Sequence, residues 1–124
     1  MARRRVDELL NDGVVEYGSI KTKRNNEGKK EGEEFTSLGF LFFNFAGIRQ
    51  GDIDFYGSLD KTVDLKVKTF FAKDVQKSHK VKFEDEVYEV IAINPDVKRK
   101  YMYWYLTKVG VFDGIQFIKD DSTN

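Results

Sequence analysis

The sequence contains no cysteine, and it has only one histidine and one proline in 124 residues. Without cysteine the chain can form no disulfide and no thiolate metal site, so its stability must come from packing or from assembly. His79 is the only histidine, which excludes a metal site with two histidine ligands and a cysteine nucleophile paired with histidine. We interpret His79 as part of a solvated strand end, because a general base needs a partner that orients it.

The chain also lacks an excess of charge of either sign, because its 21 basic and 21 acidic side chains give a net charge of zero. This balance excludes the broad positive field of a dedicated duplex-binding protein and leaves only local contacts with nucleic acid. One local candidate is a basic cluster near the N-terminus, formed by Arg3, Arg4 and Arg5. The alternative is that these arginines are the solvated start of a helix.

Long apolar runs are absent as well. No stretch approaches the ~18 apolar residues of a membrane span, and the N-terminal segment "MARRRVDELL" has no apolar run of signal-peptide length behind it. We therefore expect a soluble intracellular product with no membrane partner. Hydrophobic residues make up 40% of the chain and charged residues 34%, which predicts a single domain over residues 1–124.

Motifs for catalysis and for cofactor binding are missing. Asp52, Asp54 and Asp60 in "GDIDFYGSLDK" begin like a calcium loop, but Val63 holds the position that requires a bidentate Glu. We interpret these aspartates as turn residues. The segment "NNEGKKEGEEF" lacks the spacing of a phosphate-binding loop, and no serine stands in a nucleophile elbow. The sequence thus predicts a protein that is not an enzyme and has no catalytic residue, metal or cofactor.

The first part of the chain predicts a helix, a strand and a loop. Residues 2–12 place apolar side chains at helical spacing and end before Gly13, which predicts a short N-terminal helical arm over residues 1–13. β-forming residues follow over 14–23. No apolar residue occurs over 24–34, which predicts one long flexible polar loop. Its candidate functional residues are Arg24, Asn25, Asn26, Glu27, Gly28, Lys29, Lys30 and Glu31.

Alternating patterns predict antiparallel strands in the rest of the chain. Residues 63–71 alternate cleanly, with Asp64, Lys66 and Lys68 on a solvated face. Residues 81–93 form two strand patterns that turn near Glu84 and Asp85, and the alternation slips at Ile91, which indicates a β-bulge.

A polar turn over 94–100 then leads to a long final strand over 101–109. The predicted fold is mainly β, a small antiparallel β-barrel or sandwich over 14–110, followed by a C-terminal extension over 111–124.

The final strand carries aromatic residues on both faces. Met102, Trp104 and Leu106 would point one way and the tyrosines the other, because side chains alternate along a strand. Only one face can line the interior. The other face needs cover from the N-terminal helix, from the C-terminal "VFDGIQFI" or from another subunit, and tyrosine suits a subunit interface. The predicted interface residues are Tyr101, Tyr103, Tyr105 and Phe70.

The second half of the chain resembles the tailed-bacteriophage head-tail joining family, also called head completion or stopper proteins. The resemblance lies in the succession "VDLKVKT", "HKVKFEDEVYEVIAINPD" and "RKYMYWYLTKV". It extends over roughly residues 14–110, and 61–109 carry its pattern. Phe45 and Ala46 stand where the family has Trp-Ala. The residues that match are Val81, Val87, Tyr88, Val90, Ile93, Asp96, Arg99, Tyr103, Tyr105 and Val109.

This resemblance implies a β-barrel subunit of a homo-oligomeric ring, expected to be a dodecamer, at the head-tail joint of a virion and in the host cytoplasm during assembly. Its partners would be the portal or adaptor ring, the tail terminator or tail tube, and genomic DNA in transit. The ring would close the DNA channel after packaging and provide the tail-docking surface. The tyrosine face would meet a neighbouring subunit, and the basic cluster at residues 3–5 could reach an adjacent ring.

We hypothesise that the polar loop over 24–34 gates the DNA channel. If it gates the channel, it would become ordered when neighbouring subunits form an annulus and would yield when DNA leaves. Deleting residues 25–33 would then spare the fold and release DNA prematurely. The alternative is a surface loop on the outside of the ring.

Three other functions stay open. The chain could be a tail-completion or tail-terminator ring protein. It could be a single-strand nucleic-acid-binding barrel, in which exposed aromatic side chains stack bases beside Lys66, Lys68, Lys98 and Arg99. An enzyme is disfavoured, and turnover that is lost on changing His79 would revive it.

Overall fold

The computed structural model describes residues 9–111 and 115–119, and for residues 30, 31, 111 and 115–119 it describes the backbone only. Most of the predicted N-terminal helix, together with Arg3, Arg4 and Arg5, lies outside the described residues. The last part of that prediction is wrong, because residues 9–12 are not helical.

Their polar groups bond across to a strand instead. The Asp12 amide donates to the Phe43 carbonyl (2.9 Å) and the Asp12 carboxylate accepts from the Phe45 amide (2.9 Å). These bonds hold the segment beside β2 (Lys30–Phe45).

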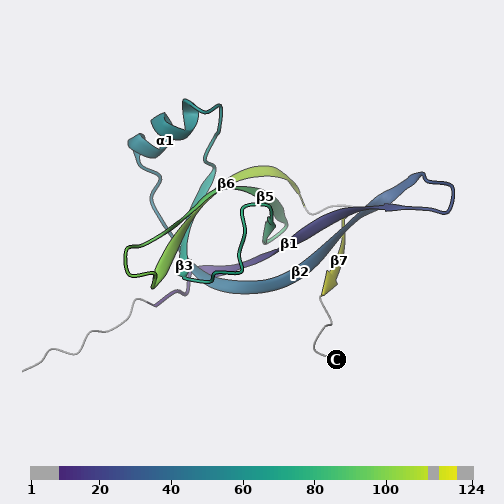
Figure 1. Ribbon diagram of the computed structural model, residues 1–124, viewed down its shortest axis with the longest axis horizontal. Coiled ribbons are helices and arrows are strands. Elements are labelled where there is room, and N and C mark those ends of the chain that lie inside the picture. Colours follow the sequence, from purple (N-terminus) through teal and green to yellow (C-terminus); the bar gives the residue numbers. More distant parts are fainter. Residues whose placement is uncertain (1–8, 112–114, 120–124) are drawn as a thin grey trace, which may run out of the picture.

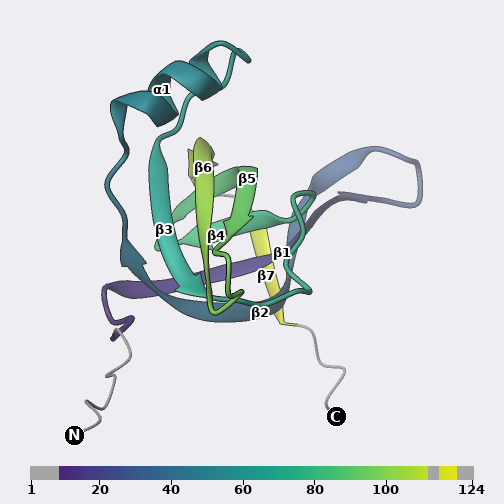
Figure 2. The same ribbon diagram turned by 60° about the vertical axis from the view of Figure 1, so that its left-hand side comes forward.

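The described chain forms one mainly β sheet, as predicted, with one short helix (Figure 1). The strand order is β1-β4-β5-β6-β3-β2, and β2 also pairs with β1, so these antiparallel strands close on themselves (Figure 2). A last strand, β7, adds to β2 in parallel. The elements are β1 (Gly13–Arg24), β2 (Lys30–Phe45), α1 (Gln50–Gly57), β3 (Leu65–Phe70), β4 (Lys80–Phe83), β5 (Glu86–Pro95), β6 (Tyr101–Val111) and β7 (Ile115–Lys119).

The inner face of the closed sheet holds the core. Met102, Trp104 and Leu106 of β6 are all buried there, as their alternation predicts. They pack with side chains from β1 to β5. The indole nitrogen of Trp104 donates to Thr69 Oγ1 at 2.9 Å, so both buried polar groups have a partner.

The predicted turn at Glu84 and Asp85 and the predicted bulge are confirmed, whereas the predicted turn over 94–100 is shorter because Asn94 and Pro95 still pair in β5. Glu84 and Asp85 form the turn between β4 and β5, and Glu84 adopts a positive φ of 55°. The register between β5 and β6 shifts between Val90 and Ala92, where the alternation slips. This bulge turns Ile91 away from the cluster that contains Val90 and into a second cluster.

The predicted loop over 24–34 is mostly strand. The turn is confined to Asn25–Lys29, and β1 and β2 pair up to Arg24 and Lys30. The Asn25 side chain closes the turn by accepting from the amides of Glu27 and Lys29, both at 2.9 Å. A strand needs a partner for its backbone more than it needs apolar side chains, which explains why composition alone failed here. The hairpin extends well beyond the closed sheet (Figure 1).

The aspartates interpreted as turn residues lie in and after a helix. Asp52 and Asp54 belong to α1, and only Asp60 lies in a turn, with a φ of 58°. Asp52 starts the helix because its carboxylate accepts the Arg49 amide hydrogen at 3.1 Å. The helix stands outside the closed sheet in both views (Figures 1 and 2).

Candidate interaction surface

The outer face of β3 and β6 brings the predicted interface residues together. Lys66 pairs with Tyr105, Lys68 with Tyr103, and Phe70 with Tyr101 across the two strands. The rings of Phe70 and Tyr101 stack with centroids 5.3 Å apart. We call this face, formed by Phe70, Tyr101, Tyr103 and the two lysines, the lysine-tyrosine surface.

The lysines lie against the tyrosine rings. Lys66 Nζ is 4.9 Å from the ring centroid of Tyr105, and Lys68 Nζ is 4.3 Å from that of Tyr101. Both ammonium groups also lie within 6 Å of the Tyr103 ring, at 5.4 and 5.8 Å. Such cation-π contacts hold the long lysine side chains flat on the sheet. The surface therefore places two lysine side chains against aromatic rings.

The cover over one end of the tyrosine row comes from α1. Tyr56 packs on Tyr105 with ring centroids 5.0 Å apart, and Ile91 completes this second cluster. Tyr105 is consequently only 7% exposed, whereas Tyr101 and Tyr103 are half-buried. Among the described residues, this cover comes from α1, a helix that the sequence pattern did not predict.

An ion pair under this surface joins β3 to α1. Lys66 was expected on a solvated face, but it is 7% exposed and its Nζ donates to Asp52 Oδ2 at 3.0 Å. Burial alone would lower the pKa of Lys66, yet the hydrogen bonds to Asp52 and Tyr105 outweigh it and the pKa lies above its ordinary value. The pKa of Asp52 is lowered despite burial, because the Arg49 amide and Lys66 both bond to the carboxylate. The charge of Lys66 is thus already neutralised.

A hollow of about 760 Å³ adjoins the lysine-tyrosine surface. The segment from Phe45 to Arg49 forms one wall, and Lys68 and Tyr103 lie on another. Its lining is rich in polar groups, so it suits a polar or anionic group better than an apolar ligand.

The described residues hold no group of three or more side chains suited to binding a metal. His79 Nδ1 accepts the Gln76 amide hydrogen at 3.0 Å, and its ring lies 5.6 Å from that of Tyr17. This nitrogen is therefore engaged in closing a local turn. No helix within 9–111 has the length and apolar character of a membrane span.

The predicted channel residues lie far from this surface. Arg24, Asn25, Asn26, Glu27, Gly28 and Lys29 form the tip of the β1–β2 hairpin, which both views place away from α1 and β3 (Figures 1 and 2). Lys30 and Glu31 begin β2, and only their backbone is described. The structure thus separates the two sets of candidate residues.

Comparison with known proteins gives a likeness of fold. No family model matches the chain, and no curated protein matches it. The solution structure of protein SF1141 from Shigella flexneri 2a is similar, with a TM-score of 0.59 and 13% sequence identity over 79% of this chain and 92% of that chain. At this identity the likeness concerns the fold alone.

Proposed function

We propose that this protein is a structural subunit of a tailed-phage virion, a head-tail joining or stopper protein that forms a ring below the portal or adaptor. In this role the ring closes the DNA channel after packaging and offers the tail a docking surface. The observation that supports it best is the β1–β2 hairpin, an arm that projects from a closed sheet. An arm repeated around a ring adds weak contacts together.

The lysine-tyrosine surface supports the same role. Phe70 is 43% exposed, and Tyr101 and Tyr103 are half-buried, so a large aromatic area is available to a neighbouring subunit. Tyrosine and aromatic residues are enriched at such interfaces. Tyr105 drops out of the contact area, since Tyr56 already covers it.

The hairpin changes how a gate would work. Its tip is closed by Asn25, and Arg24 donates to the Gly28 carbonyl at 3.0 Å, so the tip is already ordered in a single chain. A gate made from this hairpin would open and close by a change in the orientation of the arm, and not by a transition from disorder to order.

Microscopy of mutant particles tests the role. A phage that carries an early nonsense codon in this reading frame should yield free finished tails beside tailless heads that have lost DNA, and a complementing copy should restore virions. Normal virions from the mutant would refute the proposal. Unfinished tails of irregular length, with full heads, would instead assign the protein to tail completion or termination.

The gate needs a deletion that keeps the strand register. Removing residues 25–33 would join Arg24 to Glu34, whose partner in the sheet is Lys21. Replacing residues 23–32 by Asn-Gly keeps the pair Thr22–Glu33 and closes it with a tight turn. The shortened protein should assemble and lose DNA prematurely; full retention of genomes would show that the arm is no gate.

The lysine-tyrosine surface also supports binding of single-stranded nucleic acid as a second candidate function. Lys68 lies between the rings of Tyr101 and Tyr103, an arrangement that suits a phosphate beside stacked bases. Titration of labelled oligothymidine by anisotropy at two salt concentrations tests it. Binding that weakens with salt and is lost in Tyr103→Ala would support this function, and no binding at low salt would remove it.

A further inference from the structure

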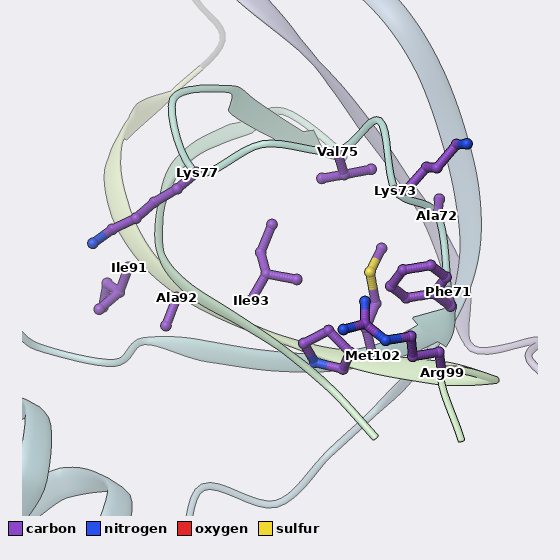
Figure 3. Close-up of a pocket in the computed structure, with 11 residues that line it drawn as sticks. Phe71, Ala72, Lys73, Val75, Lys77, Ile91, Ala92, Ile93, Arg99 and Met102 are labelled. Carbon is purple, nitrogen blue, oxygen red and sulfur yellow. The ribbon is translucent and has the colours of Figure 1, made fainter. Parts of the chain in front are cut away.

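The closed sheet has a hollow at one end that no function above uses. It has a volume of about 500 Å³ and lies between β5, Met102 of β6 and the segment over 71–77 (Figure 3). Phe71, Val75 and Ile93 line it with apolar surface, as the close-up shows. We call it the mouth pocket. Openings of β-barrels are common sites for a ligand or a partner side chain.

The edge of the mouth pocket is positively charged. Lys73, Lys77 and Arg99 surround it, and all three are exposed. Within 9–111, none of them forms an ion pair, and the nearby Asp74 accepts the Tyr17 hydroxyl at 3.5 Å. An apolar floor with an unneutralised cationic edge fits an apolar group flanked by carboxylates.

The same chain carries a surface of the opposite kind. Phe55 and Leu59, one helical turn apart in and just after α1, are 59% and 56% exposed. Asp54 and Asp60 lie beside them and are exposed, and neither forms an ion pair with a described residue. We call these four residues the α1 knob. A helix of eight residues that buries Tyr56 alone leaves most of its apolar area without cover.

The knob does not fill the mouth pocket of its own chain, since neither Phe55 nor Leu59 lines that pocket. The knob's helix is held by Tyr105 on the outer face of β6, whereas Met102, at the pocket, points to the inner face. A contact that places Phe55 in the pocket would therefore join two copies. Because the two surfaces differ, the contact is head-to-tail, the kind that builds a ring when its rotation closes.

We propose that the mouth pocket receives the α1 knob of a second copy of this chain, with Phe55 in the hollow and Asp54 and Asp60 against Lys73 and Lys77. The charges are complementary on a chain whose net charge is zero, so attraction between copies comes from this patterning. The inference goes beyond the proposed function, because self-association of the purified protein tests it and no virion is required.

Sedimentation of the full chain, from micromolar to about millimolar concentration, tests the contact. Wild type should self-associate, and the association should weaken with salt because the ion pairs are near the surface. Asp54→Lys/Asp60→Lys and Lys73→Glu/Lys77→Glu should each weaken it by about tenfold or more, since each places like charges across the contact. Lys21→Glu/Lys29→Glu changes the net charge as much as Lys73→Glu/Lys77→Glu does, but on the hairpin, and it should leave the association unchanged.

Mixing the two reversed variants gives the decisive result. The knob of one then faces the pocket of the other with opposite charge, so the mixture should associate where each variant alone does not. Circular dichroism checks that each variant is folded. Three results would each overturn the proposal. They are a wild type that stays monomeric at every concentration, a mixture that does not associate, and a hairpin control whose association weakens as much as that of the reversed variants.

Discussion

Gly18 lies where β1 meets β2 with no room for a side chain. A Cβ at this position would be 1.9 Å from the carbonyl oxygen of Thr36, a backbone atom that cannot move aside alone. The register between β1 and β2 shifts next to it, between Tyr17 and Gly18. The glycine thus permits the close approach of two strands at a bulge.

We expect Gly18→Ala to lower the free energy of unfolding by about 1–3 kcal/mol, the usual cost of forcing atoms into a packed site. Gly47→Ala is the matched control, because a Cβ there meets nothing within 4 Å, and it should change stability by less than about 0.5 kcal/mol. Urea unfolding measures both. Equal midpoints for the two variants would contradict the close approach.

The buried ion pair gives a second prediction at this scale. Asp52→Asn should destabilise the protein by about 1–3 kcal/mol, because it leaves the Lys66 ammonium buried with a weaker partner. Adding Lys66→Met should recover part of the loss, since the stem then packs against Tyr105 without a charge. A double variant less stable than Asp52→Asn would show that the lysine charge is stabilising by itself.

Among the elements, the outer part of the β1–β2 hairpin, residues 23–32, should contribute least to the stability of the fold. In the described part of the chain, the strands beyond the pair Thr22–Glu33 pair only with each other, since β7 pairs with residues 33–37 of β2. Replacing residues 23–32 by Asn-Gly should therefore shift the thermal midpoint by no more than a few degrees. A large loss of stability would mean that the arm contributes to the core.

Elements differed in how well the sequence predicted them. The strands over 63–71 and 81–109 followed from alternation, and so did the common face of Phe70, Tyr101 and Tyr103, because a buried inner face imposes a period of two. Helix α1 could not be found this way, since it buries Tyr56 alone and has no apolar stripe. The outer hairpin was missed because its strands are held by backbone pairing, which composition does not report.

The partners of Lys66 could not be predicted either. Asp52 lies fourteen residues away in sequence, and the contact exists only because α1 folds back over the outer face of β6. Polar contacts between distant segments depend on tertiary structure, and the local sequence around each residue does not predict them.

For the whole molecule, two carboxyl groups contribute to a dependence of stability on acid pH. The pKa of Glu86 is lowered by hydrogen bonds from Tyr88 and Lys108, and that of Asp52 is lowered as described above. A carboxyl with a lower pKa in the folded chain binds fewer protons there, so its stabilisation is present above the unfolded pKa of about 4 and is lost as the pH falls through the folded pKa.

We therefore expect the urea midpoint to fall as the pH is lowered from about 5 to 2. The Asp52→Asn/Lys66→Met variant should show a shallower fall, because one of the two carboxyl groups is gone. Parallel pH profiles for wild type and variant would contradict the lowered pKa of Asp52.

Closure of the sheet is uneven around the molecule. β4 joins β1 through three residue pairs, Glu16–Gly18 with Lys80–Lys82, and β2 joins β3 through another three, whereas β5 and β6 pair along most of their length. Hydrogen exchange should accordingly be fastest in β4 and the outer hairpin and slowest at the centre of β6. Uniform protection across all strands would show that these short seams open only with the whole sheet.

Trp104, the single tryptophan, is a fluorescent probe of the core. Its side chain is fully buried in the core of the closed sheet, and its indole nitrogen bonds to Thr69. Its emission should be blue-shifted in the native protein and move to the red only when the sheet opens. Association through surface contacts would leave this emission unchanged, so one fluorescence spectrum separates a variant that fails to assemble from one that fails to fold.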